Sequence, residues 1–230
     1  MLRPVLVSIS LYQATHHNPS KSLLMMTPKN IALVTCSTRD PRLNPFITGY
    51  VHEILQEELS TRPDSPRLSL IDIADQNLPL YNEPAIPSQL PESDPTLHYV
   101  HEHTRRWSAV IRQYDAFIFV TPQYNWSIPA ALKNALDHLF YEWKGKPAGI
   151  VTYGGRGGGK AGAHLQSILK GLRMHPAESM AAITVGSKTL EFCLANGRPS
   201  EEDKEAWRGN GVEEQVRLML AELLQGSQNP

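Results

Sequence analysis

Short apolar runs alternate with longer amphipathic segments along most of this chain. Five runs have the length and composition of buried or half-buried strands, and they lie at 31–35, 67–72, 116–120, 149–152 and 182–185. Apolar residues at helical spacing predict helices over 45–60, 97–113, 128–141, 160–174 and 212–225. Strands that alternate with helices predict an α/β fold, with a parallel sheet covered on both faces.

The polar segments between these elements predict loops. Residues 77–95 are rich in Pro, Asn, Ser and Asp, and this loop is too long to be a simple connector. A second loop is expected after 185, running through Pro199 towards the last helix. With 230 residues and 41% hydrophobic content, the chain can fill one core, so we predict a single domain over 30–226.

Charge and cysteine content narrow the classes of function. The net charge is -1, so nothing points to a nucleic acid or to a polybasic membrane anchor, and the acidic surface of a small electron carrier is also missing. The two cysteines, Cys36 and Cys193, lie far apart, which disfavours a disulfide framework and favours a reducing compartment such as the cytoplasm. No apolar stretch approaches the length of a membrane span.

Residues 1–29 differ in composition from the rest of the chain. The first acidic residue is Asp40, and Ser, His and Lys are plentiful before it. A transit peptide is poor in acids and rich in Ser, but it is also rich in Arg, and Arg3 is the only arginine before Arg39. We expect a disordered extension here, and organelle targeting by residues 1–25 stays open.

The most informative segment follows the third apolar run, where residues 121–137 read TPQYNWSIPAALKNALD. A polar, aromatic turn opens a helix, with Ser127 expected as its N-cap and Pro129 in its first turn. A strand that ends in such a turn is where α/β proteins bind ligands. The turn offers amides, aromatic rings and carboxamides but no nucleophile with an acid–base pair, which suits a flat, hydrogen-bonding ligand.

These residues resemble the P-E-Y-N-G-S-I-P-x-x-L-K-N-A-x-D signature of the NADPH-dependent FMN reductase family. Residues 145–155, GKPAGIVTYGG, resemble that family's G-K-P-V-x-I-V-S-Y-G-G, and the likeness extends from about residue 30 to the last helix. Two positions depart from the pattern: Gln123 replaces Glu, and Trp126 replaces Gly. We expect Trp126 either to keep ordinary dihedrals or to swing its indole over the flavin.

The resemblance implies a flavodoxin-like three-layer sandwich with a five-stranded parallel sheet of order 2-1-3-4-5. It implies a hydride passed from NADPH or NADH through FMN to a small acceptor: a quinone, an azo compound, free flavin or a ferric compound. No side chain needs to act as acid or base, so no catalytic residue is named. Members are commonly homodimers. A non-enzymatic flavin-binding electron carrier or redox-responsive partner protein is the alternative.

Three segments are expected to form the FMN site. The loop after the first strand carries hydroxyls, an arginine and helix N-terminal amides, which suit a phosphate, although an ordinary capped turn is the alternative. The family has G-S-x-R at this loop, with Cys36 in place of its Gly. The residues expected at the phosphate are Ser37, Thr38, Arg39 and Asn44. The resemblance places the flavin ring against Pro122, Gln123, Tyr124, Asn125, Trp126 and Ser127, with Tyr153, Gly154 and Gly155 as a second wall.

Two other motifs match in part. Cys36 and Arg42 have the C-x5-R spacing of a protein tyrosine phosphatase, but Leu43 stands where a hydroxyl normally supports the thiolate, so this remains a remote alternative. Residues 154–160 match G-x-x-x-x-G-K, but Ala161 lacks the hydroxyl that would bind magnesium. We expect a flexible glycine loop there instead.

Three histidines, His98, His101 and His103, lie close together in the chain. On one helix, His98 and His101 would share a face, but a solvated helix is favoured over a metal site, and no metal is expected. Trp107 is expected in the core. Residues 78–81 resemble the family's loop bordering the flavin, and an ordinary surface loop is the equal alternative.

Overall fold

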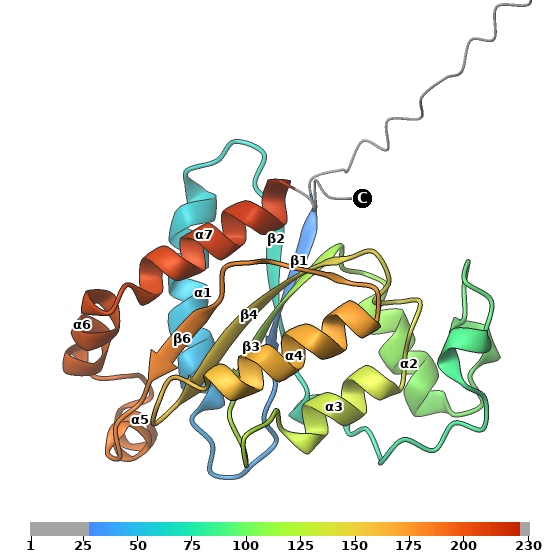
Figure 1. Cartoon of the computed structure of the whole chain (residues 1–230), viewed down its shortest axis with the longest axis horizontal. Helices are drawn as coiled ribbons and strands as arrows, with labels where there is room; N and C mark the ends of the chain where they lie inside the picture. The colour runs from blue at the N-terminus through green and yellow to red at the C-terminus, as the bar shows by residue number, and fades with distance from the viewer. Residues whose placement is uncertain (1–27, 226–230) are drawn as a thin grey trace, which may run out of the picture.

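The protein, described by a computed structural model over residues 28–225, is a three-layer α/β sandwich (Figure 1). Its strands are β1 (Asn30–Thr35), β2 (Arg67–Asp72), β3 (Ala116–Pro122), β4 (Pro147–Gly154), β5 (His175–Pro176) and β6 (Ala181–Thr184). Its α-helices are α1 (Asn44–Ser60), α2 (Glu102–Ile111), α3 (Ala130–Asp137), α4 (Gly159–Gly171), α5 (Thr189–Asn196), α6 (Glu201–Gly209) and α7 (Val212–Gln225). The extension expected over 1–29 lies outside this range except for its last two residues.

The sheet is parallel, with order β2-β1-β3-β4-β5, which confirms the flavodoxin-like prediction. The fifth strand is divided: β5 pairs with the start of β4, and β6 pairs with its end. Thr35 is paired with Asp72 on one side and with Val120 on the other. The carboxyl ends of β1, β2 and β3 therefore meet at one edge, where such folds bind ligands.

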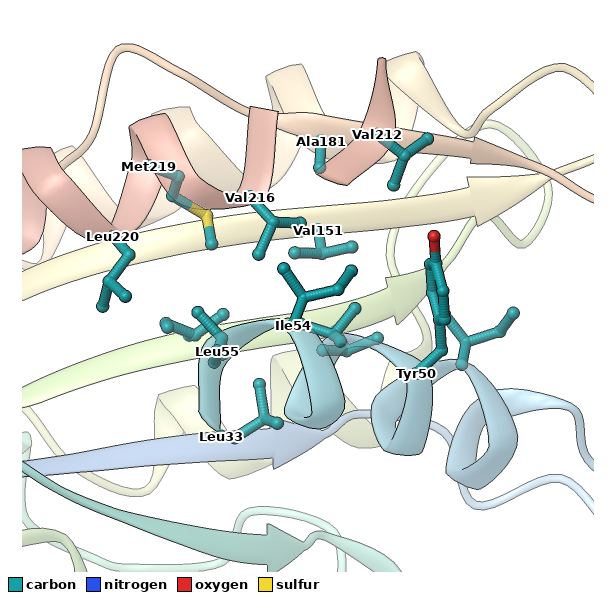
Figure 2. Close-up of a cluster of buried hydrophobic side chains, with 14 of the residues drawn as sticks. Leu33, Tyr50, Ile54, Leu55, Val151, Ala181, Val212, Val216, Met219 and Leu220 are labelled. Carbon is teal, nitrogen blue, oxygen red and sulfur yellow. The ribbon is translucent and has the colours of Figure 1, made fainter. Parts of the chain in front are cut away.

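One face of the sheet is covered by α1 and α7. Leu33 and Val151 project from the strands towards Ile54 and Leu55 of α1 and Met219 of α7 (Figure 2). Gly149 leaves room for Met219 at this contact, because a Cβ atom there would lie 2.6 Å from the Met219 sulfur and would force that side chain to shift. The packing fixes both helices against the middle of the sheet.

The opposite face is covered by α2, α3 and α4. Trp107 is buried there, as predicted, and its ring N–H donates to the Ala135 carbonyl at 2.8 Å. No helix within residues 28–225 is both long enough and apolar enough to cross a membrane.

The predicted helix over 97–113 is wrong in its first turns. A 3-10 turn, η3 (Thr96–His98), comes first, and α2 begins only at Glu102. The reason is Glu83, whose carboxylate accepts hydrogen bonds from the amides of Val100 and His101 at 2.9 and 3.0 Å. That long-range cap holds the chain extended before α2 and is invisible to local periodicity.

Candidate active site

The loop after β1 is shaped from inside by Asn44. This side chain is fully buried, and its Oδ1 accepts the amide protons of Cys36 at 2.9 Å and Ser37 at 2.7 Å. Its Nδ2 donates to the Val120 carbonyl at 3.0 Å. Asn44 is therefore occupied by the loop itself and is too deeply buried to meet a phosphate, which corrects its expected role as a direct ligand.

A second clamp holds the same loop from β2. Arg42 donates to the Ser37 carbonyl at 2.6 Å and forms a two-bond ion pair with Asp72, both at 2.7 Å. The hydrogen bond from Asp72 raises the pKa of Arg42 further above its ordinary value. This pair is not predicted by the sequence pattern, although the strand order places the end of β2 beside β1 and so brings Asp72 within reach.

The β1 loop meets the β3 turn through two hydroxyl groups. Ser37 is buried, and its Oγ lies 2.7 Å from the Tyr124 hydroxyl. Thr38 and Arg39, the next two residues, are both exposed. Thr38 lines a hollow of about 370 Å³ beside Leu78 and Asn134. Arg39 lines a second hollow with Tyr124 and Tyr153.

The turn after β3 is a tight two-residue hairpin. The amide of Tyr124 donates to the Ser127 carbonyl at 2.9 Å, and the reverse bond is 3.0 Å. Asn125 and Trp126 both have positive φ, 46° and 68°, as a type I′ turn requires. The expectation of ordinary dihedrals for Trp126 is therefore wrong. Within residues 28–225 the amides of Asn125 and Trp126 donate to no protein acceptor, and both residues are exposed.

Ser127 was predicted to be the N-cap of α3, and this prediction is wrong. The helix begins at Ala130 after Pro129, and the Ser127 hydroxyl instead lies 2.6 Å from Nδ1 of His164 on α4. Residues 124–127 form the type I′ turn. The helix therefore starts later than its apolar periodicity suggests. His164 was not among the predicted site residues, and its sequence position gives no signal for this contact.

Gln123 caps α4. Its Oε1 accepts the amide protons of Lys160 at 3.0 Å and Ala161 at 3.3 Å. Since a carboxamide oxygen can accept both bonds without a charge, the change from the family's Glu keeps this role intact. The cap ties the β3 turn to the first turn of α4.

The second wall follows β4. Tyr153 is opposite Pro122 in the sheet and is almost fully buried, which raises the pKa of its phenol. Gly154 accepts a hydrogen bond from Gly157, and Gly155 lies exposed in the turn between them. Gly158 has φ of 80°, and a Cβ there would lie 3.0 Å from the Tyr153 carbonyl oxygen. Glycine therefore allows the chain to turn sharply from β4 into α4.

The phosphatase alternative is wrong. Cys36 is fully buried, and burial, with a smaller contribution from Asp72, raises its thiol pKa well above the ordinary value. The thiol donates to the Val34 carbonyl at 3.3 Å, and Arg42 is engaged by Asp72. A neutral, inaccessible thiol cannot act as a nucleophile.

The histidine cluster differs from the expected pair. His98 lies in η3, while His101 and His103 stack with ring centroids 5.1 Å apart, and His103 meets His138 at 5.6 Å. Within residues 28–225, no group of His, Cys, Asp and Glu side chains has the arrangement of a metal site.

These loops are the elements on which the family's two signature blocks fall. The family model for NADPH-dependent FMN reductases matches residues 29–187. The chain belongs to the NADPH-dependent FMN reductase family. Its membership makes it an FMN-dependent NAD(P)H oxidoreductase, and the alternative of a non-enzymatic electron carrier is set aside.

Individual relatives agree with this family assignment. The chain is 37% identical over 195 residues to an NAD(P)H-dependent FMN reductase of Nectria sp., covering 84% of this chain and 94% of the relative. It is 39% identical over 163 residues to one of Saccharomyces cerevisiae, covering 70% and 84%. A flavoenzyme NAD(P)H:(acceptor) oxidoreductase from Paracoccus denitrificans has the same fold, with a TM-score of 0.59 at 23% identity over 83% of this chain and 97% of that one.

Proposed function

We propose that this FMN reductase family member holds FMN across the carboxyl ends of β1, β3 and β4 and reduces quinones. The observation that carries the site assignment is the β3 turn, in which the amides of Asn125 and Trp126 are exposed and make no protein hydrogen bond within the described chain. Two such donors fit the acceptor edge of an isoalloxazine ring. When bound, FMN accepts a hydride from NADPH or NADH and passes it to the acceptor.

The remaining donors fit the other end of the cofactor. Arg39 and Thr38 lie exposed on the β1 loop, two strands from the β4 wall formed by Tyr153, Gly154 and Gly155. The Ser37 hydroxyl, predicted as a third phosphate donor, is as buried as Asn44 and instead pairs with Tyr124. Arg39 forms no ion pair within residues 28–225, so its charge is available for a phosphate. Asn44 and Arg42 keep this loop in place without touching the ligand.

Quinone reduction is supported by relatives as well as by the site. A protein named quinone reductase from Pseudomonas putida is 33% identical to this chain over 128 residues. Because no side chain is needed as an acid or base, the acceptor only has to reach the exposed ring. The FMN-loaded protein should oxidise NADPH steadily when a benzoquinone is added. Flavin reduction without turnover on quinone would leave the site assignment intact and overturn the acceptor.

We extend the proposal to a cytoplasmic homodimer. The compartment is supported by two free, buried cysteines, Cys36 and Cys193. The dimer is supported by the resemblance and by apolar side chains exposed on the long segment after β2, among them Leu80 at 83% and Leu97 at 83%. Light scattering should give twice the chain mass, and Leu97→Lys should shift it towards the monomer. A wild-type monomer at tens of micromolar would contradict the dimer.

A further inference from the structure

Two exposed cations follow β4 in the chain, and neither has a protein counter-charge within residues 28–225. Arg156 is exposed in the turn after β4, and Lys160 is exposed in the first turn of α4. Neither takes part in an ion pair within residues 28–225. The sequence from 143 to 177 contains no Asp or Glu at all. Neither Arg156 nor Lys160 therefore has a carboxylate partner within the described residues or an acidic neighbour in this stretch of the sequence.

These cations lie on the side of the site away from the FMN phosphate loop. In the sheet, β3 separates β1 from β4, and neighbouring strands are about 4.8 Å apart, so the β4 turn lies roughly 10 Å from the β1 loop. Lys160 instead adjoins the flavin turn, with its Nζ 5.8 Å from the centre of the Trp126 ring. The Gln123 cap and the Ser127–His164 contact fix the start of α4 to this turn.

A hydride donor must bring its nicotinamide to the flavin beside this turn, and the rest of the dinucleotide must then extend over a neighbouring surface. NADPH differs from NADH only in its 2′-phosphate, a dianion for which Lys and Arg are the usual protein ligands. We infer that Arg156 and Lys160 bind the 2′-phosphate of NADPH and so give this protein a preference for NADPH over NADH. The inference rests on the proposed flavin site.

The geometry assigns this role to side chains rather than to the helix N-terminus. The amides of Lys160 and Ala161 are already capped by Gln123, so they cannot be the main phosphate donors. Trp126, with 67% of its surface exposed, gives a ring of the dinucleotide a flat apolar contact next to the charge. The preference should therefore depend on the two charged side chains.

The test compares FMN-loaded wild type with Lys160→Gln, Arg156→Gln and the double variant. Loss of one charged contact should lower kcat/KM for NADPH about tenfold or more, and the value for NADH much less. By calorimetry, adenosine 2′,5′-bisphosphate should bind wild type more tightly than adenosine 5′-monophosphate does, and the double variant should lose this difference. Lys170→Gln is the matched control, since Lys170 is exposed on the same helix about 15 Å further along.

An unchanged ratio of NADPH to NADH efficiency in the double variant would overturn the inference, and so would an equal loss in Lys170→Gln. Equal binding of the two adenosine nucleotides by wild type would also overturn it. A wild-type protein that fails to bind FMN would overturn the flavin site itself. The two failures are therefore distinguishable.

Discussion

At the scale of single residues, Trp126 occupies a backbone conformation that suits glycine better. Its φ of 68° lies in the left-handed region, which costs a side chain with a Cβ about 1–2 kcal/mol. The indole makes little packing to offset this, since it is 67% exposed and contacts Lys160 as its cation–π partner. The strain therefore sits where the flavin is proposed to bind, which is typical of functional sites.

The strain can be measured with two variants that both remove the indole. Trp126→Gly should be more stable than Trp126→Ala by about 1 kcal/mol, because only glycine adopts the Asn-Gly type I′ turn without cost. Urea unfolding of the two proteins, both without ligand, checks the difference. Equal stability, or a more stable alanine variant, would show that residue 126 does not hold a positive φ.

At the scale of elements, the segment after β2 is attached to α2 and α3 by histidines. His138 lies with Nε2 3.2 Å from the Pro79 carbonyl oxygen, and His103 lies 3.2 Å from the Asn82 side-chain oxygen. Burial lowers the pKa of both rings, and for His103 the neighbouring His138 and His101 lower it further. The buried Glu83 and the exposed Asp137 oppose the effect on His138.

This cluster predicts a loss of stability in mild acid. Because the folded pKa values lie below the ordinary value of 6.5, the native rings bind fewer protons than the unfolded ones, and stability falls as the pH drops through about 6.5. The free energy of unfolding should fall between pH 7 and pH 5.5 by more in wild type than in His138→Gln. An identical fall in both proteins would show that His138 does not contribute.

The elements also show how far the sequence could be read. Buried strands such as β1 and β3, flanked by amphipathic helices, can be recognised in the sequence, whereas the strand order is implied by the family resemblance. Helices α5 and α6 were missed, because α5 is only eight residues long and α6 buries only Trp207. The start of α2 was misplaced because it depends on Glu83, a residue nearly twenty positions earlier.

The candidate site was predictable in its position but not in its internal contacts. The two signature blocks mark the turns after β3 and β4, a likeness to G-S-x-R marks the loop after β1, and the sheet order brings the three together. The roles of Asn44, Gln123 and His164 arise from hydrogen bonds between distant segments, which residue types alone do not specify. Asn44 illustrates this, since its position after the β1 loop suits a ligand contact until its burial is known.

At the scale of the whole molecule, a buried charge that affects stability lies at the other end of the sheet from the proposed FMN site. Lys146 lies at the amino end of β4, away from the proposed site, and donates to the Ile111 carbonyl at 3.0 Å. Burial lowers its pKa to about 8, partly opposed by Asp115 and Glu142. The folded protein therefore binds this proton less tightly than the unfolded chain does, and stability rises with pH above about 8.

Replacing Lys146 should reveal how much its buried charge lowers the free energy of unfolding. Between pH 7 and pH 9.5, wild type should gain about 1–2 kcal/mol of unfolding free energy relative to Lys146→Met, whose side chain does not titrate. The variant keeps the apolar stem, and the Ile111 carbonyl still accepts from the Tyr114 amide. Parallel stability curves for the two proteins over this range would show that Lys146 keeps an ordinary pKa.

The central claim, an FMN site with its phosphate on the β1 loop, is tested most directly by flavin titration. Quenching of FMN fluorescence should give one site per chain, and Arg39→Ala should weaken FMN by about ten- to a hundredfold, since it removes one charge-assisted contact. Riboflavin, which lacks the phosphate, should bind both proteins alike. No FMN binding at micromolar protein, or equal losses for FMN and riboflavin, would contradict the account.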